Sequence, residues 1–275
     1  MSELHRFEGY IFDLDGTIYL GNHAIEGAVE TVGFLRQMGK KLLFLTNKTI
    51  ESREHYVSKL NRLGIQVTLE NILTPAVVTI RYLKNHFSNA RVYVIGEDVL
   101  KQEMLEKGIR FASAPEETDV VVVSWDRQFH YDHLNFAYQA IKRGAFVLAT
   151  NPDRTCPVPG GDVPDCGAMI GSIEGATGKK IETIIGKPSR LTVQAALEIL
   201  QLDGKQCLMV GDRLETDVLM GQLAGINTAL VLTGVTRRDA IDSAAYRPDY
   251  VLNSVHDIFK GGTLETFRGN RGNKQ

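Results

Sequence analysis

The chain has 275 residues, of which 43% are hydrophobic and 23% charged, a composition typical of soluble globular proteins. The 31 Lys and Arg against 33 Asp and Glu give a formal net charge of −2, so no basic excess is available to hold a nucleic acid or an anionic membrane. No apolar stretch reaches the length of a membrane span or of a signal peptide's apolar region. The three cysteines, Cys156, Cys166 and Cys207, lack metal-ligand spacing, which favours reduced thiols and predicts a cytoplasmic protein.

Short apolar runs alternate along the chain with segments of helical period, which predicts βαβ units around a sheet buried on both faces. The fold class expected is therefore α/β. Strands are predicted at 9–12, 41–45, 91–95, 120–124, 146–149, 182–185, 206–210 and 228–232. The main helices are predicted at 24–38, 53–63, 131–143 and 189–200.

Polar residues follow several of the predicted strands. Ligands of open parallel sheets bind outside the carboxyl ends of the strands, so these residues are expected to converge on one crevice. Segment 79–180 has its own alternation of predicted strands and helices and is predicted to be an inserted second domain. This leaves 1–78 and 181–260 as the core. Segment 261–275 is rich in Gly, Asn and charge, and is predicted to be a flexible tail.

Asp13 and Asp15 end the first predicted strand, and Gly16 permits the turn that brings both carboxylates to one site. Two carboxylates held this close repel unless a cation sits between them, and Mg²⁺ prefers oxygen ligands of this kind. The pair is not specific alone: an Asp-rich turn that caps backbone amides explains it equally well, and Asp-x-Asp also binds metal in nucleotide-sugar glycosyltransferases.

The other segments each have a functional and a structural interpretation. Thr46 and Asn47 offer a hydroxyl and backbone amides that suit a phosphate oxygen, or they form a helix N-cap. Lys187 can neutralise a phosphate, or it is an ordinary surface charge. Asp212 follows a strand and Asp217 lies near a helix start, where it can accept hydrogen bonds or orient a metal-bound water, as can any acidic loop.

Together and in this order, the segments resemble the four motifs of the haloacid dehalogenase-like hydrolase superfamily. The matching residues are Asp13-Leu14-Asp15-Gly16-Thr17, Thr46, Lys187, and Gly211-Asp212 with Asp217. The resemblance implies a Rossmann-like doubly wound parallel-sheet core with an inserted α/β cap domain of the C2 type. The finer resemblance is to class IIA of this superfamily, the branch of NagD-like and AraL-like sugar phosphatases, 4-nitrophenylphosphatases and pyridoxal phosphate phosphatases. The segments that carry it are 149–153, 186–189 and 211–213.

The resemblance implies a Mg²⁺-dependent phosphatase that acts through an aspartyl-phosphate. Asp13 would be the nucleophile and Asp15 the general acid and base. Asp13, Asp212 and the backbone carbonyl of Asp15 would hold Mg²⁺ with Asp217 behind them. Thr46, the Asn47 amide and Lys187 would hold phosphate oxygens. In the cap segment 151–163, expected to be a loop, Asn151, Asp153 and Arg154 are candidates for reading the leaving group.

Small phosphorylated metabolites are the expected substrates, with sugar phosphates favoured and p-nitrophenyl phosphate as a surrogate. The alternatives are a phosphotransferase or mutase with the same aspartyl-phosphate, a phosphatase for pyridoxal phosphate, phosphoglycolate or nucleotide monophosphates, and a binding protein without activity. A homodimer through the cap fits this branch. Nucleic acid and membrane partners are not expected.

Overall fold

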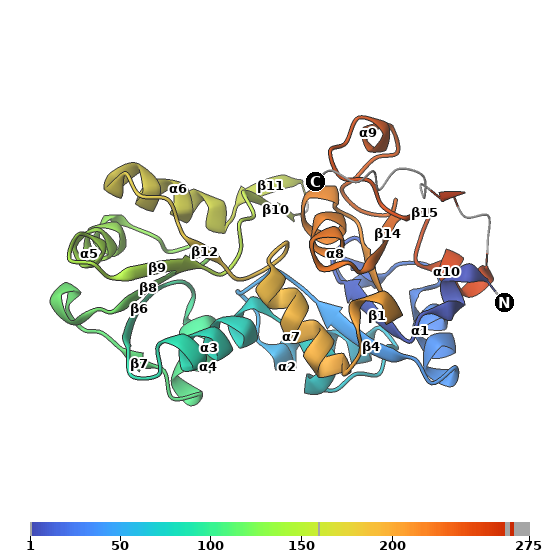
Figure 1. Ribbon diagram of the computed structural model, residues 1–275, viewed down its shortest axis with the longest axis horizontal. Coiled ribbons are helices and arrows are strands. Elements are labelled where there is room, and N and C mark those ends of the chain that lie inside the picture. Colours follow the sequence, from blue (N-terminus) through green and yellow to red (C-terminus); the bar gives the residue numbers. More distant parts are fainter. Residues whose placement is uncertain (1, 159, 262–264, 267–275) are drawn as a thin grey trace. The chain divides into compact units, whose positions relative to one another are not determined.

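The structure is a computed structural model that describes residues 2–158, 160–261 and 265–266. By its internal contacts the chain forms two compact units, each built from separate stretches of sequence (Figure 1). Unit 1 comprises Met1–Thr46, Val57–Ile72 and Val193–Gln275. Unit 2 comprises Asn47–Tyr56 and Leu73–Thr192.

Unit 1 is built on a seven-stranded sheet with the order β16-β15-β14-β13-β1-β4-β5. The strands from β4 to β15 run parallel, and only β16 pairs antiparallel, with β15. The bounds are β1 Gly9–Asp13, β4 Lys41–Leu45, β5 Ile72–Leu73, β13 Cys207–Gly211, β14 Asn227–Val231, β15 Tyr250–Leu252 and β16 Glu265–Thr266. A small antiparallel hairpin of β2 (Tyr19–Leu20) and β3 (His23–Ala24) follows β1.

Helices connect these strands, as parallel pairing requires. The α-helices of unit 1, two of which begin just inside unit 2, are α1 Ala28–Gln37, α2 Arg53–Arg62, α7 Arg190–Leu200, α8 Leu219–Ala224, α9 Asp239–Asp242 and α10 His256–Lys260. Short 3₁₀ turns are η1 Glu3–Arg6, η2 Leu69–Asn71 and η4 Gly204–Gln206, and a π-turn, η5, covers Leu214–Val218.

The centre of the unit 1 core is β1, in which every residue is buried. Its aromatic rings continue into the neighbouring strand: Tyr10 stacks on Phe12 at 6.0 Å and Phe12 on Phe44 at 5.7 Å between ring centroids. The Tyr10 hydroxyl donates to the Leu4 carbonyl at 2.6 Å, so its polar end is satisfied inside the core. The strand that ends in Asp13 is therefore held firmly by packing.

Unit 2 contains a five-stranded, all-parallel sheet with the order β12-β9-β8-β6-β7. The strands are β6 Arg91–Ile95, β7 Arg110–Phe111, β8 Val120–Val123, β9 Phe146–Ala149 and β12 Thr183–Ile184. Its helices are α3 Pro75–His86, α4 Asp98–Glu106, α5 Tyr131–Lys142 and α6 Cys166–Thr177, with a 3₁₀ turn η3 at Pro115–Glu117. Trp125, Ala137 and Ile173 pack with the sheet in one buried cluster.

The predicted α/β class is confirmed, and most strand and helix limits agree within one to four residues. The sequence did not reveal β2, β3, β5, β7, β15 or β16. It predicted a loop where β10 (Thr155–Val158) and β11 (Gly161–Pro164) form an antiparallel hairpin. Strands of two to four residues are too short to show a period.

The strand before Lys187 differs from expectation in its pairing. The sequence predicts that it belongs to the core, whereas β12 pairs with β9 in unit 2, and residues 181–192 group with that unit. The predicted domain limits, 1–78 with 181–260 for the core and 79–180 for the inserted domain, remain a prediction. Of the predicted tail 261–275, residues 262–264 and 267–275 lie outside the described part of the chain.

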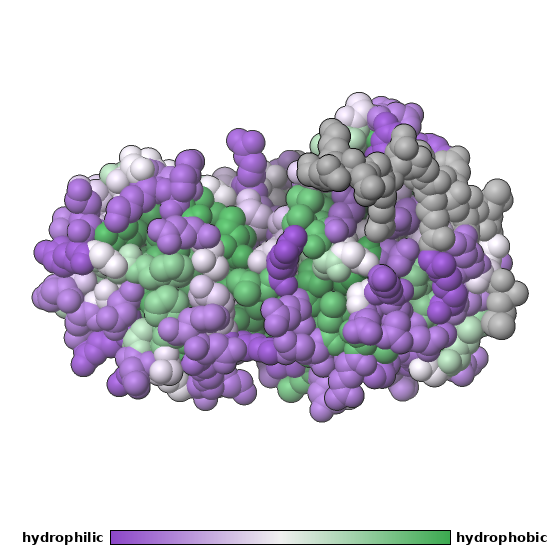
Figure 2. Space-filling view, viewed as in Figure 1, coloured by the Kyte–Doolittle hydropathy of each residue, from purple (hydrophilic) through white to green (hydrophobic). Residues whose placement is uncertain are grey.

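Hydrophilic side chains cover much of the face drawn in Figure 2. Within the described ranges, no helix combines the length and the apolar character needed to cross a bilayer. Cys156, Cys166 and Cys207 are buried thiols that form no disulfide. Burial raises the pKa of Cys207 to about 11 and that of Cys166 to about 12. Both thiols are therefore protonated at neutral pH.

The packing around β1 predicts a large effect of truncation there. Ile11→Ala removes a fully buried side chain and is expected to lower the free energy of unfolding by about 2–5 kcal/mol. The control Leu223→Ala alters a side chain that is 42% exposed and should cost about 0.5 kcal/mol or less. Urea denaturation followed by circular dichroism measures both, and equal shifts of the midpoint would contradict the assignment of β1 to the core.

Candidate active site

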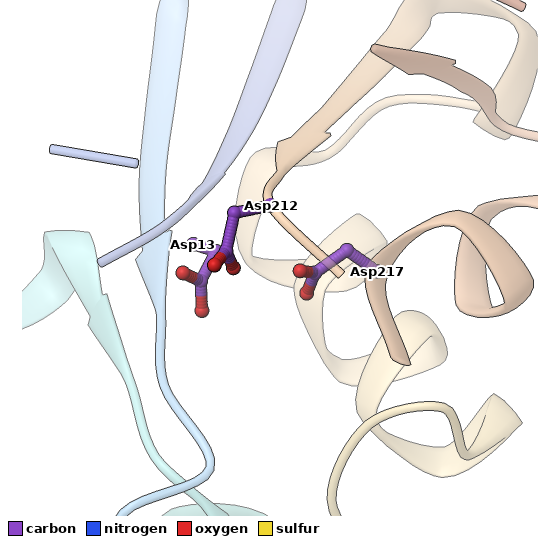
Figure 3. Close-up of side chains that lie close together, drawn as sticks. All are labelled: Asp13, Asp212 and Asp217. Carbon is purple, nitrogen blue, oxygen red and sulfur yellow. The ribbon is translucent and has the colours of Figure 1, made fainter. Parts of the chain in front are cut away.

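Three carboxylates meet at the carboxyl edge of the unit 1 sheet (Figure 3). Asp13 ends β1, Asp212 directly follows β13, and Asp217 lies in the π-turn after it. Because β1 and β13 are neighbouring parallel strands, with Phe12 opposite Val210, their ends bring Asp13 and Asp212 together. One carboxylate oxygen from each of the three residues lies within 4.8 Å of the others, and all three residues are buried.

Each carboxylate is held by a nearby donor. The Thr17 hydroxyl donates to Asp13 Oδ2 at 3.3 Å. The backbone N–H of Val235 donates to Asp212 Oδ2 at 2.7 Å, and that of Arg213 to Asp217 Oδ2 at 3.1 Å. These bonds fix the three groups before any ligand arrives, which is the preorganisation that a polar site requires.

Glycines make the close packing around two of the carboxylates possible. A Cβ at Gly234 would lie 1.9 Å from Asp212 Oδ2, and one at Gly211 would lie 2.3 Å from the Asp217 Cγ. Gly16 has a positive φ of 87° and would also clash with Asp212, at 2.6 Å. Gly211 and Gly16 belong to the predicted motifs, whereas Gly234 was not singled out because nothing in the sequence near it signals chemistry.

The donor set fits a divalent cation. Three buried carboxylates repel one another, and a cation among them relieves both the repulsion and the cost of burial. All three offer oxygen, the ligand that Mg²⁺ prefers. The carboxylate of Asp217, which is predicted to support the metal site from behind, lies within the same 4.8 Å group as the other two.

Two further predicted residues of unit 1 lie at the same edge. Thr46 is buried directly after β4, whose last residue Leu45 pairs with Asp13. Asp15 lies in the turn after β1, and its Oδ2 accepts a hydrogen bond from the Tyr19 hydroxyl at 3.3 Å. Tyr19 is not predicted as a site residue from the sequence.

In unit 2, four predicted residues form one hydrogen-bonded group. The Asn47 side chain pairs with the backbone of Lys187: its Oδ1 accepts from the Lys187 N–H at 2.8 Å, and its Nδ2 donates to the Lys187 carbonyl at 3.1 Å. Nδ2 also donates to Asp153 Oδ2 at 3.1 Å. Asn151 donates to the Asn47 carbonyl at 3.0 Å and accepts from the Asp153 N–H at 2.9 Å.

This group explains why Gly186 precedes the lysine. A Cβ at Gly186 would lie 2.6 Å from Asn47 Oδ1 and 2.7 Å from the Thr150 carbonyl. The backbone before Lys187 therefore runs directly against the strand end that carries Thr150 and Asn151. Arg154, the remaining predicted residue, is exposed at the foot of the β10–β11 hairpin.

A cavity of about 1050 Å³ in unit 1 lies elsewhere. It is bordered by Lys41, Asn61 and Leu200, among others, and Lys41 begins β4 whereas Thr46 follows its end. The cavity thus opens at the opposite edge of the sheet from the carboxylates. Lys41 already donates to the Leu200 carbonyl at 2.6 Å, a contact that stabilises the end of α7.

Two family descriptions match the chain. Residues 10–110 match "Haloacid dehalogenase-like hydrolase", and residues 184–258 match a second description of haloacid dehalogenase-like hydrolases. The first range contains Asp13, Asp15 and Thr46, and the second contains Lys187, Asp212 and Asp217. The matches therefore cover all four motif segments.

Individual relatives match over nearly the whole chain. The sugar-phosphatase AraL of Bacillus subtilis is 41% identical over 252 residues, which cover 92% of each chain. The acid sugar phosphatase of Staphylococcus saprophyticus is 32% identical over 94% of this chain and 98% of its own.

Solved structures agree with these sequence matches. The p-nitrophenyl phosphatase from Archaeoglobus fulgidus superposes with a TM-score of 0.87 at 35% identity, covering 92% of this chain and 98% of that one. NagD from E. coli K-12 superposes with a TM-score of 0.84 at 32% identity, covering 91% and 98%. The chain belongs to the haloacid dehalogenase-like hydrolases, in the branch of NagD-like and AraL-like proteins.

Proposed function

We propose that the protein is a Mg²⁺-dependent phosphatase that hydrolyses small phosphate monoesters, with sugar phosphates as its preferred substrates. The observation that carries the proposal is the group of buried carboxylates of Asp13, Asp212 and Asp217 at the carboxyl edge of a parallel sheet. Relatives named sugar phosphatase and p-nitrophenyl phosphatase, aligned over more than nine-tenths of this chain, support the same reaction class.

In this proposal the reaction has two steps. A carboxylate oxygen of Asp13 attacks the substrate phosphorus, the bond to the leaving oxygen breaks, and Asp15 gives that oxygen a proton. A water molecule then attacks the phosphorus of the aspartyl-phosphate while Asp15 takes its proton. The bond between phosphorus and the Asp13 oxygen breaks, which regenerates the Asp13 carboxylate and releases inorganic phosphate, so the net reaction is hydrolysis.

The residues that would hold Mg²⁺ are Asp13, Asp212 and the backbone carbonyl of Asp15. When bound, the ion neutralises the negative charges that the phosphoryl oxygens bring against Asp13. We propose that Asp217 orients this site, because its Oδ2 is fixed by the Arg213 N–H and its carboxylate packs against the bare backbone of Gly211.

We assign the remaining phosphoryl contacts to Thr46, the Asn47 backbone amide and Lys187, as the family's motifs imply. The Asn47 side chain pairs with both backbone polar groups of Lys187, which supports a fixed path for the lysine's backbone. The ammonium group of a lysine whose backbone is fixed in this way can act as a point charge that stabilises the transferring phosphoryl group in both steps.

The candidate contacts to the leaving group lie in segment 151–154 of unit 2. Asn151 is buried and both ends of its amide are hydrogen-bonded within unit 2, so we propose that it positions Asp153 instead of contacting the sugar. Asp153 and Arg154 remain the candidates for hydroxyl contacts. A relative from Bacillus subtilis named 5'-nucleotidase YutF, 34% identical over 90% of this chain, makes nucleoside monophosphates the second substrate class to test. Cytoplasmic location and a homodimer through the cap stay predictions.

The reaction class is tested with p-nitrophenyl phosphate. We expect turnover with Mg²⁺ that EDTA abolishes, and Asp13→Asn should lower kcat by about 10³-fold or more because the nucleophile is lost. The exposed Asp242→Asn serves as the control and should keep full activity. A folded native chain that releases no p-nitrophenol with any divalent cation would overturn the proposal.

The role of Asp217 is tested by titrating Mg²⁺. Asp217→Asn should raise the concentration for half-maximal activity by about 10- to 100-fold, since a neutral amide supports the cation less well. Glu215→Gln changes an exposed acid in the same turn and should leave the titration unaltered. If both variants titrate like the native protein, Asp217 does not act on the metal.

Substrate selection is tested by comparing two substrates. Arg154→Ala should lower kcat/KM for a hexose 6-phosphate by about tenfold, the loss expected for one hydrogen bond to a charged group, while p-nitrophenyl phosphate changes less than about twofold. Arg143→Ala, an exposed arginine at the end of α5, is the control. An equal loss for both substrates would assign Arg154 to phosphate binding or to folding.

A further inference from the structure

We propose that Tyr19 is a positioning residue for Asp15, and that its phenol hydroxyl holds the carboxyl group that gives and takes the proton. The inference rests on the proposed function, because Asp15 acts as acid and base only in that reaction. Its direct support is the hydrogen bond from the Tyr19 hydroxyl to Asp15 Oδ2, at 3.3 Å.

The turn after β1 brings these two residues together. The Leu14 carbonyl accepts from the N–H groups of Thr17, Ile18 and Tyr19 at 2.9–3.2 Å, so the chain folds back on itself directly after Asp15. The Gly16 N–H closes the turn by donating to the Tyr19 carbonyl at 2.8 Å, and Asp15 and Tyr19 form an isolated β-bridge. Side chains of bridged residues lie beside one another, which accounts for the contact.

The ring of Tyr19 is fixed as well. It is fully buried, and the Lys59 ammonium, which comes from α2, lies 3.5 Å from its centroid. A cation over a ring face is attracted by the ring's π-electrons, more strongly where water is excluded. The same positive charge withdraws electron density from the phenol and makes its O–H a better donor to a carboxylate.

A fixed donor matters for a carboxyl group that acts twice. Proton transfer needs the acid within hydrogen-bond distance of the leaving oxygen and, in the next step, of the attacking water. A carboxyl group free to rotate about its Cβ–Cγ bond would spend part of its time in unproductive orientations. Because Tyr19 holds Oδ2, the whole carboxyl group of Asp15, and with it the oxygen that bears the proton, keeps one position through both steps. The gain in rate from this fixed position appears in kcat and not in KM.

The test uses Tyr19→Phe, which removes one hydroxyl and keeps the ring under Lys59. In single turnovers with enzyme in excess, transfer from an alkyl phosphate such as a hexose 6-phosphate should slow by about tenfold. Transfer from p-nitrophenyl phosphate should change by less than about twofold, since p-nitrophenolate leaves without a proton. KM should stay unchanged for both substrates.

Two further variants separate positioning from stability. Tyr10→Phe removes a fully buried hydroxyl whose partner is the Leu4 carbonyl, so it costs a similar hydrogen bond without touching Asp15. It should leave the alkyl-to-aryl rate ratio of the native protein unaltered. Lys59→Met should lower that ratio in the same direction as Tyr19→Phe but by a smaller factor, because the ring stays and only its cation is lost.

The outcomes are distinguishable. A native protein active on both substrates, with an unchanged alkyl-to-aryl ratio in Tyr19→Phe, would overturn the role of Tyr19 and leave the proposed function standing. Equal losses in Tyr10→Phe and Tyr19→Phe would likewise reduce Tyr19 to a structural residue. A native protein inactive on both would overturn the proposed function itself, and the inference with it.

Discussion

The close approach of three buried carboxylates is the constraint on which the rest of unit 1 depends. Buried acids of like charge are costly, and they persist only where backbone donors, a cation or both compensate. Here the N–H groups of Val235 and Arg213 and the Thr17 hydroxyl supply part of that compensation. The all-buried strand β1 and its neighbour β13 hold the acids in place, so the stability of the core is also what keeps the charged groups together.

The two units fix their predicted site residues in different ways. In unit 1 the functional side chains come from strand ends and are fixed by turns, as with the fold-back of the chain after Asp15. In unit 2 a single amide, that of Asn47, joins segments more than a hundred residues apart by pairing with Lys187 and Asp153. Side-chain networks of this kind define one backbone arrangement because each member is satisfied only when the others are in place.

Most of this site can be predicted from the sequence because the motif residues follow apolar strands whose pattern is strong. Asp13, Thr46 and Asp212 could be placed at a sheet edge from that pattern alone, and the α/β class followed from the same alternation. The pairing of β12 with β9 was missed, since two apolar residues before a glycine fit either sheet. Tyr19 was missed because its function depends on a turn of four residues and on a lysine from α2, neither of which has a sequence signature.

The glycines around the carboxylates have a consequence for how sequence variation in this protein is read. At Gly234 the nearest oxygen of Asp212 occupies the space that any side chain would need, at 1.9 Å from a Cβ. Intolerance to substitution will therefore extend to positions that have no chemical group of their own. A survey of inactivating substitutions would therefore identify the acidic site by the glycines around it as well as by its aspartates.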